Sequence, residues 1–405
     1  MAVEPLVPVW VRRVIESPSS ATERLRLAFL GDPNSIHFQR WVNFMAERGN
    51  RVSVLVPTGK EVGPGLHEAI SVERFSPFYG RLIPAIGVLS ARRSLRQVLA
   101  RIQPDVLNAH YLTVHGYHAW ISGRHPYVVT LWGSDVLVSP RKSRLKAVLG
   151  RITLRAADLV MVNSEALKRG ALNLGAPAER TEMIQWGVDL TRFGPGPDPV
   201  ALRERLGLQG KRVIFSPRSI TRLYRQQVIV RSLAELPADV SLVMTLQHSQ
   251  PDEVAAVRAL IAQLGLSDRV LIVPEIDHAE MPDFLRLAEV VVSVPASDST
   301  SVTILEALAS QAQIVAADLP SVREWLLELD APALVPVDDV DATAAALTRA
   351  LDRSPAERAE IGRLGRAIVE ARADQARSLA HVEDLYRDLA RRRGRGRGRA
   401  AVSGG

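Results

Sequence analysis

The 405-residue sequence predicts an α/β protein with two domains, each built on a parallel sheet covered by helices. Short apolar runs alternate with longer amphipathic stretches, which is the pattern of parallel strands joined by helices. This alternation occurs as two similar series, and a chain of this length exceeds what one hydrophobic core usually holds. Between the series lies "GPGPDPV" at 194–200, where three prolines and two glycines indicate a linker.

The apolar runs predict strands in both domains. In the N-terminal domain, residues 24–193, they lie at 25–30, 51–56, 105–109, 127–131, 158–162 and 182–186. In the C-terminal domain, residues 201–372, they lie at 211–216, 240–245, 269–273, 289–294, 313–317 and 332–337. Such alternation predicts two Rossmann-like, doubly wound domains that face one another across a cleft.

Two helices stand out by their apolar faces. "HFQRWVNFMAERG" at 37–49 places Phe38, Trp41 and Met45 on one face, and Gly49 is positioned to end the helix. "HVEDLYRDLARR" lies in a predicted last helix at 373–390. This helix is expected to return to the N-terminal domain.

Both ends of the chain differ from the body in composition. Residues 1–23 place Glu4 and two prolines before Arg12 and Arg13, which is the wrong order for a signal peptide, and they are expected to form a flexible leader. The arginine- and glycine-rich tail 391–405 is expected to be disordered. The tail supplies six of the seven net positive charges, at positions 391, 392, 393, 395, 397 and 399, which leaves +1 for the body. The charge therefore does not indicate specific nucleic-acid binding, although the tail could contact RNA or an anionic membrane, or remain solvated.

Composition also limits the chemistry and the compartment. The sequence has no cysteine, which excludes thiolate nucleophiles and fits a cytoplasmic protein. No apolar run approaches the roughly 18 to 20 residues that cross a bilayer, so peripheral association with the inner face of a membrane is the alternative to a free cytoplasmic protein. "DVD" at 339–341 has the form of a metal-binding pair, but it precedes a predicted helix for which Asp341 would be the N-cap. No metal is expected.

One loop carries the strongest functional indication. "PASDSTSVT" at 295–303 joins a predicted strand to a predicted helix, and ligands of parallel sheets bind at such strand ends. Small hydroxyl residues allow a phosphate to approach the helix start, and Asp298 and Glu306 could accept hydrogen bonds from sugar hydroxyls. A structural alternative is that Thr303 and Glu306 form a capping box.

Several ordered motifs resemble those of the family-four retaining glycosyltransferases of the GT-B fold. The loop and its helix, "PASDSTSVTILEALASQAQIVAADLPSVREWL", are similar to the family's signature. The resemblance continues in "GDPNSIHFQRWVNFMAERGNRVSVLV", "PDVLNAHYLTVHGYHAW", "VVTLWGSDVL" and "IFSPRSITRLY", and it spans residues 25–390. Agreement of several motifs in order is more specific than any single motif.

The resemblance implies roles for particular residues of the C-terminal domain. Glu306 would hold the ribose hydroxyls of a nucleotide-sugar donor, and Asp298 would contact hydroxyls of the transferred sugar. Arg218 would neutralise phosphate charge, which suits a guanidinium because it stays charged when desolvated. The backbone at Ser299, Thr300 and Ser301 would approach the sugar and the diphosphate.

The resemblance also implies three contacts from the N-terminal domain. Gly31 and Asp32 occupy the loop that would meet phosphate and acceptor, and His110 would touch the donor sugar near the reacting carbon. His37, His115 and His118 lie near the same predicted loops, where each is as readily a structural histidine as a ligand. Ser134 and Asp135 could line the acceptor side or form a capped turn.

The sequence departs from the family pattern at two places in the C-terminal domain. Asp298 stands where the family has glutamate, followed by Ser-Thr-Ser where Gly-Phe-Gly is usual. Leu223 stands where the family has a lysine. Either Arg222 or Arg225 could supply the missing cation, and the sequence leaves this choice open.

The expected activity is therefore transfer of a hexose-type sugar, with retention, from a nucleoside-diphosphate sugar to a hydroxyl acceptor. The acceptor could be a glycan, a small glycoside or a lipid-linked molecule, and no cofactor other than the donor substrate is implied. Two alternatives are a catalytically weak sugar-nucleotide-binding protein and another GT-B enzyme, such as an epimerase or a phosphorylase.

Overall fold

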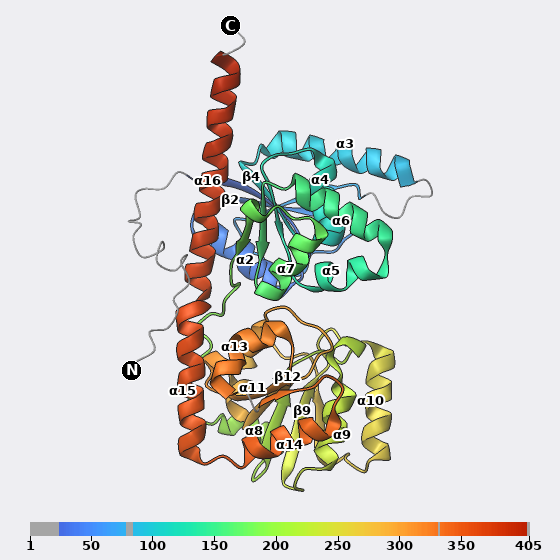
Figure 1. Ribbon diagram of the computed structural model, residues 1–405, viewed down its shortest axis with the longest axis vertical. Helices are drawn as coiled ribbons and strands as arrows, with labels where there is room; N and C mark the ends of the chain where they lie inside the picture. The colour runs from blue at the N-terminus through green and yellow to red at the C-terminus, as the bar shows by residue number, and fades with distance from the viewer. Residues whose placement is uncertain (1–23, 78–83, 331–332, 403–405) are drawn as a thin grey trace. The chain divides into compact units, whose positions relative to one another are not determined.

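The computed structural model describes residues 24–77, 84–330 and 333–402, which belong to two compact units (Figure 1). Unit 1 consists of two segments of the chain, one that ends at Gln185 and one that begins at Arg377. Unit 2 comprises Trp186–Ala376. The leader expected at residues 1–23 lies outside the described residues.

Unit 1 contains a seven-stranded parallel sheet in the order β3-β2-β1-β4-β5-β6-β7. The chain starts in the middle of the sheet and winds outward in both directions, so it changes direction between the neighbours β1 and β4. The elements are β1 (Arg26–Leu30), α2 (Ile36–Glu47), β2 (Arg51–Pro57), β3 (Ser71–Phe75), α3 (Pro84–Ile102), β4 (Val106–His110), α4 (Tyr117–Ser122), β5 (Tyr127–Thr130), α5 (Ser134–Leu137), α6 (Arg144–Ala156), β6 (Leu159–Val162), α7 (Glu165–Leu174) and β7 (Thr181–Met183).

Unit 2 repeats this architecture with a six-stranded parallel sheet in the order β10-β9-β8-β11-β12-β13. Here the change of direction falls between β8 and β11. The elements are α8 (Val200–Arg205), β8 (Arg212–Ser216), α9 (Gln226–Ala234), β9 (Val240–Thr245), α10 (Pro251–Gln263), β10 (Val270–Val273), α11 (Met281–Leu287), β11 (Val290–Ser293), α12 (Val302–Ala309), β12 (Gln313–Ala317), α13 (Pro320–Asp330), β13 (Leu334–Val335), α14 (Val340–Leu351) and α15 (Pro355–Arg372).

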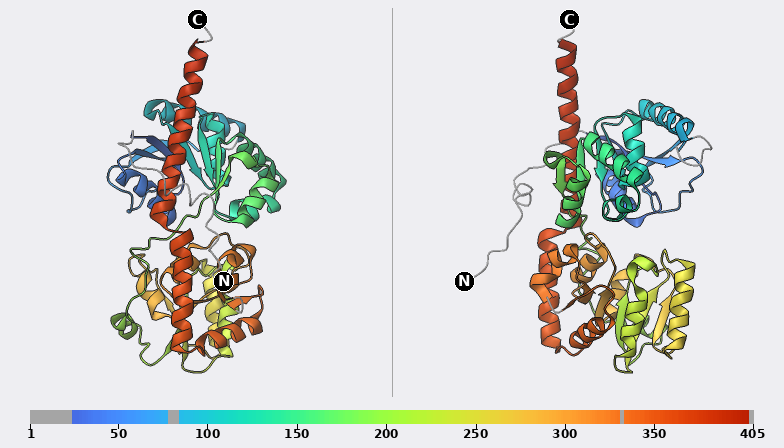
Figure 2. Two further views of the ribbon diagram at one scale, coloured as in Figure 1. Left: turned by 60° about the vertical axis from the view of Figure 1, so that its left-hand side comes forward. Right: turned by 45° about the vertical axis from the view of Figure 1, so that its right-hand side comes forward.

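The central strands of both sheets are buried on both faces, which explains their continuous apolar sequences. All residues of β4, β6, β9 and β12 are buried. Figure 2 shows helices on both sides of each sheet. Covered faces of this kind are what a parallel sheet joined by helices requires, because each connection places a helix on one face.

The predicted strands are confirmed, with one omission. Each of the apolar runs corresponds to a strand, although the last contributes only Leu334 and Val335. The omitted strand is β3, whose sequence Ser71–Phe75 is mostly polar and exposed because it lies at the edge of the sheet. The exposed residues of β3 are Ser71, Val72 and Arg74, so this edge strand lacks the apolar run by which the other strands were found.

The boundary predicted at 194–200 is wrong, because the division falls between Gln185 and Trp186. Residues 186–193 are fixed to unit 2 by backbone hydrogen bonds on both sides of Val188. Its N–H donates to the carbonyl of Ala373 at 2.9 Å, and its carbonyl accepts from Gln375 at 3.1 Å. Phe193 is fully buried in the core of unit 2. The Pro- and Gly-rich stretch is an irregular segment within unit 2.

The last helix, α16 (Gln375–Val402), packs against unit 1 as expected. Leu379, Val382 and Tyr386 recur every three or four residues and are buried. The Tyr386 hydroxyl accepts a hydrogen bond from Trp41 Nε1 at 3.2 Å and another from Asn108 Nδ2. These contacts tie α16 to α2 and to the centre of the sheet.

The expectation that the helix ends at residue 390 is wrong, since α16 continues to Val402. The tail contains several arginines between its glycines, and arginine is a strong helix former. Helix therefore replaces the disorder expected over 391–402.

Replacing Tyr386 with phenylalanine is expected to lower the free energy of unfolding of unit 1 by about 1–3 kcal/mol. The ring would still fill its site, but the buried donors of Trp41 and Asn108 would lose a common acceptor. Urea unfolding followed by circular dichroism measures the change, with Asp388→Asn on the exposed face of α16 as the control. Equal midpoints for the two variants would contradict this account of the anchor.

Candidate functional site

The predicted loop follows β11 and leads into α12, at the point where the sheet of unit 2 changes direction. Ser301 is the N-cap of α12, and its side chain makes no capping hydrogen bond. Thr303 is already inside the helix, so the capping box considered for Thr303 and Glu306 is wrong. Glu306 is instead 8% exposed, and its carboxylate lies 3.4 Å from Nε2 of His278.

His278 links Glu306 to Arg192. Its Nδ1 lies 2.6 Å from Nη1 of Arg192, and its ring packs edge-on against Phe193 with centroids 5.3 Å apart. A guanidinium only donates, so Nδ1 accepts and the proton of a neutral imidazole is on Nε2, directed at Glu306. Glu306 is therefore held in one orientation at the first turns of α12.

Arg218 lies in the loop after β8, beside the loop that follows β11. Its Nη2 is 3.0 Å from Oδ2 of Asp298, and its Nη1 donates to the Ser301 hydroxyl at 2.6 Å. The guanidinium also lies over the ring of Tyr224, 4.1 Å from the centroid. Desolvation would lower the pKa of Arg218, but the charge of Asp298 and the contact with Tyr224 raise it. The guanidinium therefore stays charged although it is largely buried.

Asp298 is the partner that makes this burial possible. Burial raises the pKa of Asp298, and the positive charge of Arg218 opposes that rise. The carboxylate also accepts from the backbone N–H of Ser299 at 2.9 Å, while the Ser321 hydroxyl donates to the carbonyl of Asp298 at 2.9 Å. The structure thus brings Asp298 and Arg218 together.

Two hydrogen bonds of Gln226 hold the loop that carries Arg218. The amide of Gln226 accepts from the Ser216 hydroxyl at 2.9 Å and donates to the carbonyl of Arg218 at 2.8 Å. Gln226 is 2% exposed. Sequence reasoning missed both Tyr224 and Gln226, which follow Arg218 by six and eight residues.

Both residues considered as the second cation are paired with other carboxylates. Arg222 has an 80% exposed side chain and lies 2.8 Å from Glu253 of α10. Arg225 lies 2.9 Å from Asp338, which precedes α14. Leu223 contributes its carbonyl, which accepts from the N–H of Ala296. Each arginine is therefore paired with a carboxylate other than Asp298.

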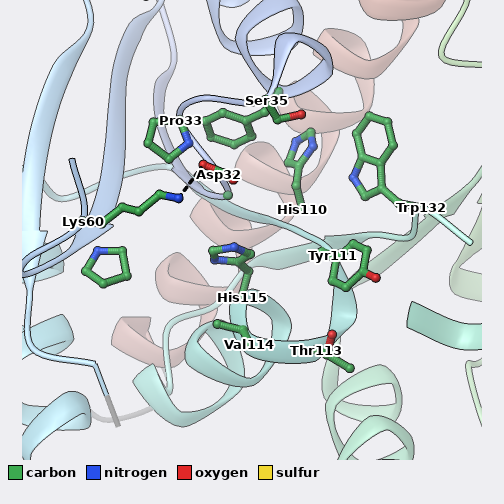
Figure 3. A pocket seen from close by; sticks show the side chains of 13 residues that line it. Asp32, Pro33, Ser35, Lys60, His110, Tyr111, Thr113, Val114, His115 and Trp132 are labelled. Carbon is green, nitrogen blue, oxygen red and sulfur yellow. Dashed lines mark ion pairs between the residues drawn. The ribbon is translucent and has the colours of Figure 1, made fainter. Parts of the chain in front are cut away.

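Unit 1 contains a pocket at the equivalent place in its own sheet, where β1 and β4 end (Figure 3). Its volume is about 460 Å³. The lining residues are Gly31, Asp32, Pro33, Ser35, Phe38, Pro57, Lys60, His110, Tyr111, Thr113, Val114, His115 and Trp132. The pocket therefore brings together the three residues that the resemblance assigned to this domain, Gly31, Asp32 and His110. Of the other candidates, His115 also lines it, whereas Ser134 and Asp135 do not.

Gly31 is required by its close contact with Phe38. A Cβ at this position would collide with the Phe38 ring. Phe38 in turn packs edge-on against His110, with ring centroids 5.1 Å apart. Trp41 and Trp132 also pack against this imidazole, with ring centroids 4.9 and 5.8 Å from that of His110.

His110 is a buried, neutral residue. It is 3% exposed, and burial lowers its pKa to about 3. Neither ring nitrogen has a hydrogen-bond partner among the residues that the structure describes. This imidazole therefore carries no charge at neutral pH.

Asp32 and Lys60 provide the charges of the pocket, with Nζ of Lys60 3.2 Å from Oδ1 of Asp32 (Figure 3). Lys60 follows β2 and was missed in the sequence, although the strand-end rule that indicated Gly31 applies to it as well. Trp132 was missed as well, although it also follows a strand end, that of β5.

The far wall of the pocket has an unusual backbone. Tyr111 and Val114 have φ values of 81° and 71°, which are strained for residues with a Cβ and especially for valine. The buried carboxylate of Asp135 stabilises this turn by accepting from the N–H groups of Leu112 and Gly133, each at 2.8 Å. Asp135 therefore has a structural role, and Ser134 positions Tyr111 through a 2.6 Å hydroxyl contact.

Residues 24–77, 84–330 and 333–402 contain neither a metal-ligating cluster nor a membrane-spanning helix. These residues contain no group of three or more His, Asp or Glu side chains that could hold a metal ion. None of their helices has the length and apolarity needed to cross a bilayer. "DVD" at 339–341 is a helix start, but the N-cap is Asp339, which accepts from Ala342 N–H at 2.8 Å, so the assignment of Asp341 is wrong.

Two doubly wound parallel sheets, each with polar side chains at its change of direction, define an α/β enzyme of the GT-B class. Residues 26–164 match the model of the glycosyl transferase 4-like family, and residues 201–367 match that of the glycosyl transferases group 1. The chain belongs to the group 1 glycosyltransferase family, as its motifs indicated.

Known relatives agree with this assignment. The chain is 33% identical to the D-inositol 3-phosphate glycosyltransferase of Xylanimonas cellulosilytica over 71% of its own length and 73% of that protein. Its fold is similar to that of sucrose-phosphate synthase from Thermosynechococcus elongatus, with a TM-score of 0.78, 19% identity and coverage of 90% and 99% of the two chains. Anabaena Alr3699/HepE in complex with UDP and glucose gives a TM-score of 0.77, 21% identity and coverage of 90% and 100%.

Tyr224 is expected to affect turnover by positioning Arg218. Tyr224→Leu would remove the ring under the guanidinium and lower kcat about five- to thirtyfold, equivalent to roughly 1–2 kcal/mol. Tyr224→Phe keeps the ring and is the matched control, with kcat expected within about twofold of the wild type. Steady-state kinetics of glycosyl transfer would decide, and equal kcat values for the two variants would exclude this role.

The buried histidines of unit 1 predict a loss of stability in acid. Burial lowers the pKa of His110 to about 3 and that of His118 to about 4, whereas the unfolded chain takes up protons near pH 6.5. Their contribution to the free energy of unfolding is complete above pH 6.5 and is lost as the pH falls toward 4. The loss has reached about 2 kcal/mol per histidine at pH 5. Urea midpoints between pH 8 and 4.5 measure this.

His118→Asn should reduce the acid sensitivity, because it removes one buried imidazole from unit 1. His248→Asn replaces an exposed histidine of unit 2 and serves as the control. A wild-type stability that stays constant from pH 7 to pH 4.5 would contradict the prediction.

Proposed function

We propose that this enzyme transfers a hexose from a nucleoside-diphosphate sugar to a hydroxyl acceptor with retention at the anomeric carbon. The observation that carries the proposal is the buried Arg218–Asp298 pair next to the immobilised Glu306, at the change of direction of the unit 2 sheet. That position is where open α/β sheets bind their ligands. The group provides acceptors for hydroxyls and a guanidinium for phosphate within one loop cluster.

Each residue has a role that its surroundings support. Glu306 accepts hydrogen bonds from the ribose, as a carboxylate held by His278 on one side can do. Arg218 stabilises the departing diphosphate, and Asp298 contacts the sugar hydroxyls. Ser299, Thr300 and Ser301 are all at most 5% exposed, so their backbone is a fixed wall beside the sugar and diphosphate.

The pocket of unit 1 is proposed to hold the acceptor. Gly31 and Asp32 bound it, and His110 contributes a neutral imidazole to the sugar rather than a proton. Lys60 adds a cation at its rim. D-inositol 3-phosphate, which the Xylanimonas relative's name specifies, is therefore a suitable first acceptor to test.

UDP-glucose is proposed as the first donor to test, because HepE has been solved in complex with it. We place the enzyme in the cytoplasm, because a sequence without cysteines fits a reducing compartment. Arg391, Arg392 and Arg393 make the end of α16 a candidate contact with anionic lipid, and through it with a lipid-linked acceptor. No step of the proposed reaction is assigned to a metal.

A catalytically weak sugar-nucleotide-binding protein remains the second candidate. It is favoured by one observation, namely that Arg222 and Arg225 are paired with Glu253 and Asp338. A diphosphate leaving group would then be neutralised by Arg218 without a second arginine from this loop. Turnover, rather than donor binding, distinguishes the two candidates.

Glu306→Ala is expected to raise the KM for the donor about tenfold, and Arg218→Ala to lower kcat about a hundredfold. The first loses hydrogen bonds to the ribose, and the second loses charge stabilisation that grows as the diphosphate departs. Release of UDP from UDP-glucose with and without the acceptor is the measurement, with an anomeric analysis of the product by NMR.

Glu235→Ala and Arg231→Ala are matched controls, because both side chains are exposed at α9 and belong to neither site. Acceptor-dependent release supports the transferase, and a product of inverted configuration would overturn retention. Saturable donor binding without turnover would instead establish the weak binder.

A further inference from the structure

Three helices that cover one face of the unit 1 sheet contain no acidic residue. Helices α3, α4 and α6 join β3 to β4, β4 to β5 and β5 to β6, steps that all run in the same direction across the sheet. Right-handed connections therefore place the three helices on the same face, and α4 packs against both of the others (Figure 1). We call this surface the α3–α4–α6 face.

Positive charge is concentrated on the α3–α4–α6 face. Four basic residues in α3 and four in α6 give these helices a formal charge of +8, with no aspartate or glutamate to offset it. The whole chain carries +7, so all its other residues together carry +7 − 8 = −1. The charge of the protein is therefore strongly asymmetric. The eight residues are Arg92, Arg93, Arg96, Arg101, Arg144, Lys146, Arg151 and Arg155.

Most of these charges are not used in ion pairs. Within the part of the chain that the structure describes, Arg101 is paired with Glu73, and the other seven basic side chains are paired with no carboxylate. The helix next to α6, α7, adds one carboxylate, Glu165, together with Lys168 and Arg169. An anionic partner would therefore meet cations that are not already neutralised by the protein.

Helix α6 also exposes an apolar stripe. Leu145, Val148 and Ile152 are 67%, 55% and 39% exposed, and their spacing of three and four residues places them on one side of the helix. Thr153 and Leu154, which point away from this side, are buried. The stripe therefore lies on the solvent side of α6, where packing within unit 1 does not account for large apolar residues.

A row of arginines runs beside this stripe. Arg144, Arg151 and Arg155 are exposed, and successive members are seven and four residues apart, so they also share one side of α6. Helix α6 thus presents aliphatic side chains and guanidinium groups next to each other along its whole length.

Helix α3 presents the same two components. Val88 and Leu89 are exposed near its start, and Arg92 and Arg93, also exposed, follow one turn later. Single exposed apolar residues are common on the surfaces of proteins. Apolar residues in line and bordered by cations are instead typical of helices that lie in the headgroup region of a membrane.

We propose that the α3–α4–α6 face binds the surface of an anionic bilayer. The apolar stripe of α6 enters the boundary between headgroups and acyl chains, and the arginine row contacts lipid phosphates. RNA would meet the same cations, but an aliphatic stripe adds nothing to a phosphate contact, so the bilayer is the partner that uses both components. This inference does not depend on the proposed reaction.

This surface is distinct from the end of α16. Helix α2 joins β1 to β2, a step in the opposite direction across the sheet, so it covers the other face. Tyr386 of α16 accepts a hydrogen bond from Trp41 of α2, which places α16 on the side of α2. The two candidate lipid contacts can therefore be tested separately.

Sedimentation of the full chain with phosphatidylcholine vesicles, with and without phosphatidylglycerol, tests the proposal. The wild type is expected to bind the vesicles that contain phosphatidylglycerol. Leu145→Ser/Val148→Ser should lower the partition coefficient about thirtyfold, because it removes two apolar side chains from the bilayer. Arg144→Gln/Arg151→Gln/Arg155→Gln should lower it about a hundredfold, at about fivefold for each cation.

Matched substitutions in unit 2 provide the baseline. Leu327→Ser removes an exposed leucine of α13, and Arg231→Gln removes an exposed arginine of α9. Both variants should bind the vesicles as the wild type does. Arg391→Gln/Arg392→Gln reports on the end of α16, and its loss of vesicle binding while both α6 variants keep theirs would overturn the proposal.

A fluorescent label gives a second readout, because the chain has no cysteine and a single one can be introduced. Val148→Cys carrying an environment-sensitive fluorophore should show stronger, blue-shifted emission with phosphatidylglycerol vesicles. Glu47→Cys, at an exposed position of α2, is the control and should show no change. No change at position 148, or the same change at both positions, would contradict the proposal.

Two results would assign the face to a different partner. A dimer in light scattering without lipid, converted to a monomer by Leu145→Ser/Val148→Ser, would show that a second copy covers the stripe. RNA binding that the arginine variant loses and the serine variant keeps, with no vesicle binding by the wild type, would identify a nucleic-acid surface. Either result would overturn the bilayer proposal, whereas weaker vesicle binding of both α6 variants with unchanged unit 2 controls supports it.

Discussion

The need to neutralise a buried guanidinium organises the candidate donor site. Arginine stays protonated in proteins, so Arg218 must be accompanied by an anion wherever it is buried. Asp298 provides it at 3.0 Å, and this one contact joins the loop after β8 to the loop after β11. Removing one partner of a buried pair usually costs about 3–5 kcal/mol, because it leaves an uncompensated charge. The conformation of both loops therefore depends on the pair.

The same interaction changes the start of α12. Serine at an N-cap normally accepts a hydrogen bond from the first turn, which closes the helix end. Here the hydroxyl of Ser301 accepts from Arg218, and no side-chain cap forms. Arg218 thus lies beside a helix start that has no serine cap, and both the guanidinium and the uncapped helix start favour an anion at this place.

Sequence reasoning predicted what depends on short-range pattern. Buried strands have continuous apolar runs, so their order along the chain could be predicted. The strand ends near which Gly31, His110 and Arg218 lie, and the helix that carries Glu306, could be predicted as well. It failed where tertiary contacts decide. The pairing of Ser301 with Arg218 accompanies a helix start without a side-chain cap, and the backbone bond of Val188 to Ala373 fixes residues 186–193 to unit 2. Neither contact has a local signal, because the partners are 83 and 185 residues apart.

Because position 223 is a leucine and not a lysine, the loop after β8 has one positive charge fewer near Asp298 than the family pattern. With Leu223 there, and with Arg222 bound to Glu253, the loop offers Arg218 as the cation beside Asp298. In the proposed reaction, an arriving diphosphate would compete with Asp298 for one guanidinium, and the carboxylate would become available to sugar hydroxyls as the phosphate took its place. The shorter aspartate suits this exchange, because its carboxylate stays close to the loop backbone, where the N–H of Ser299 already binds it. The two departures from the family pattern are thus physically linked through Arg218.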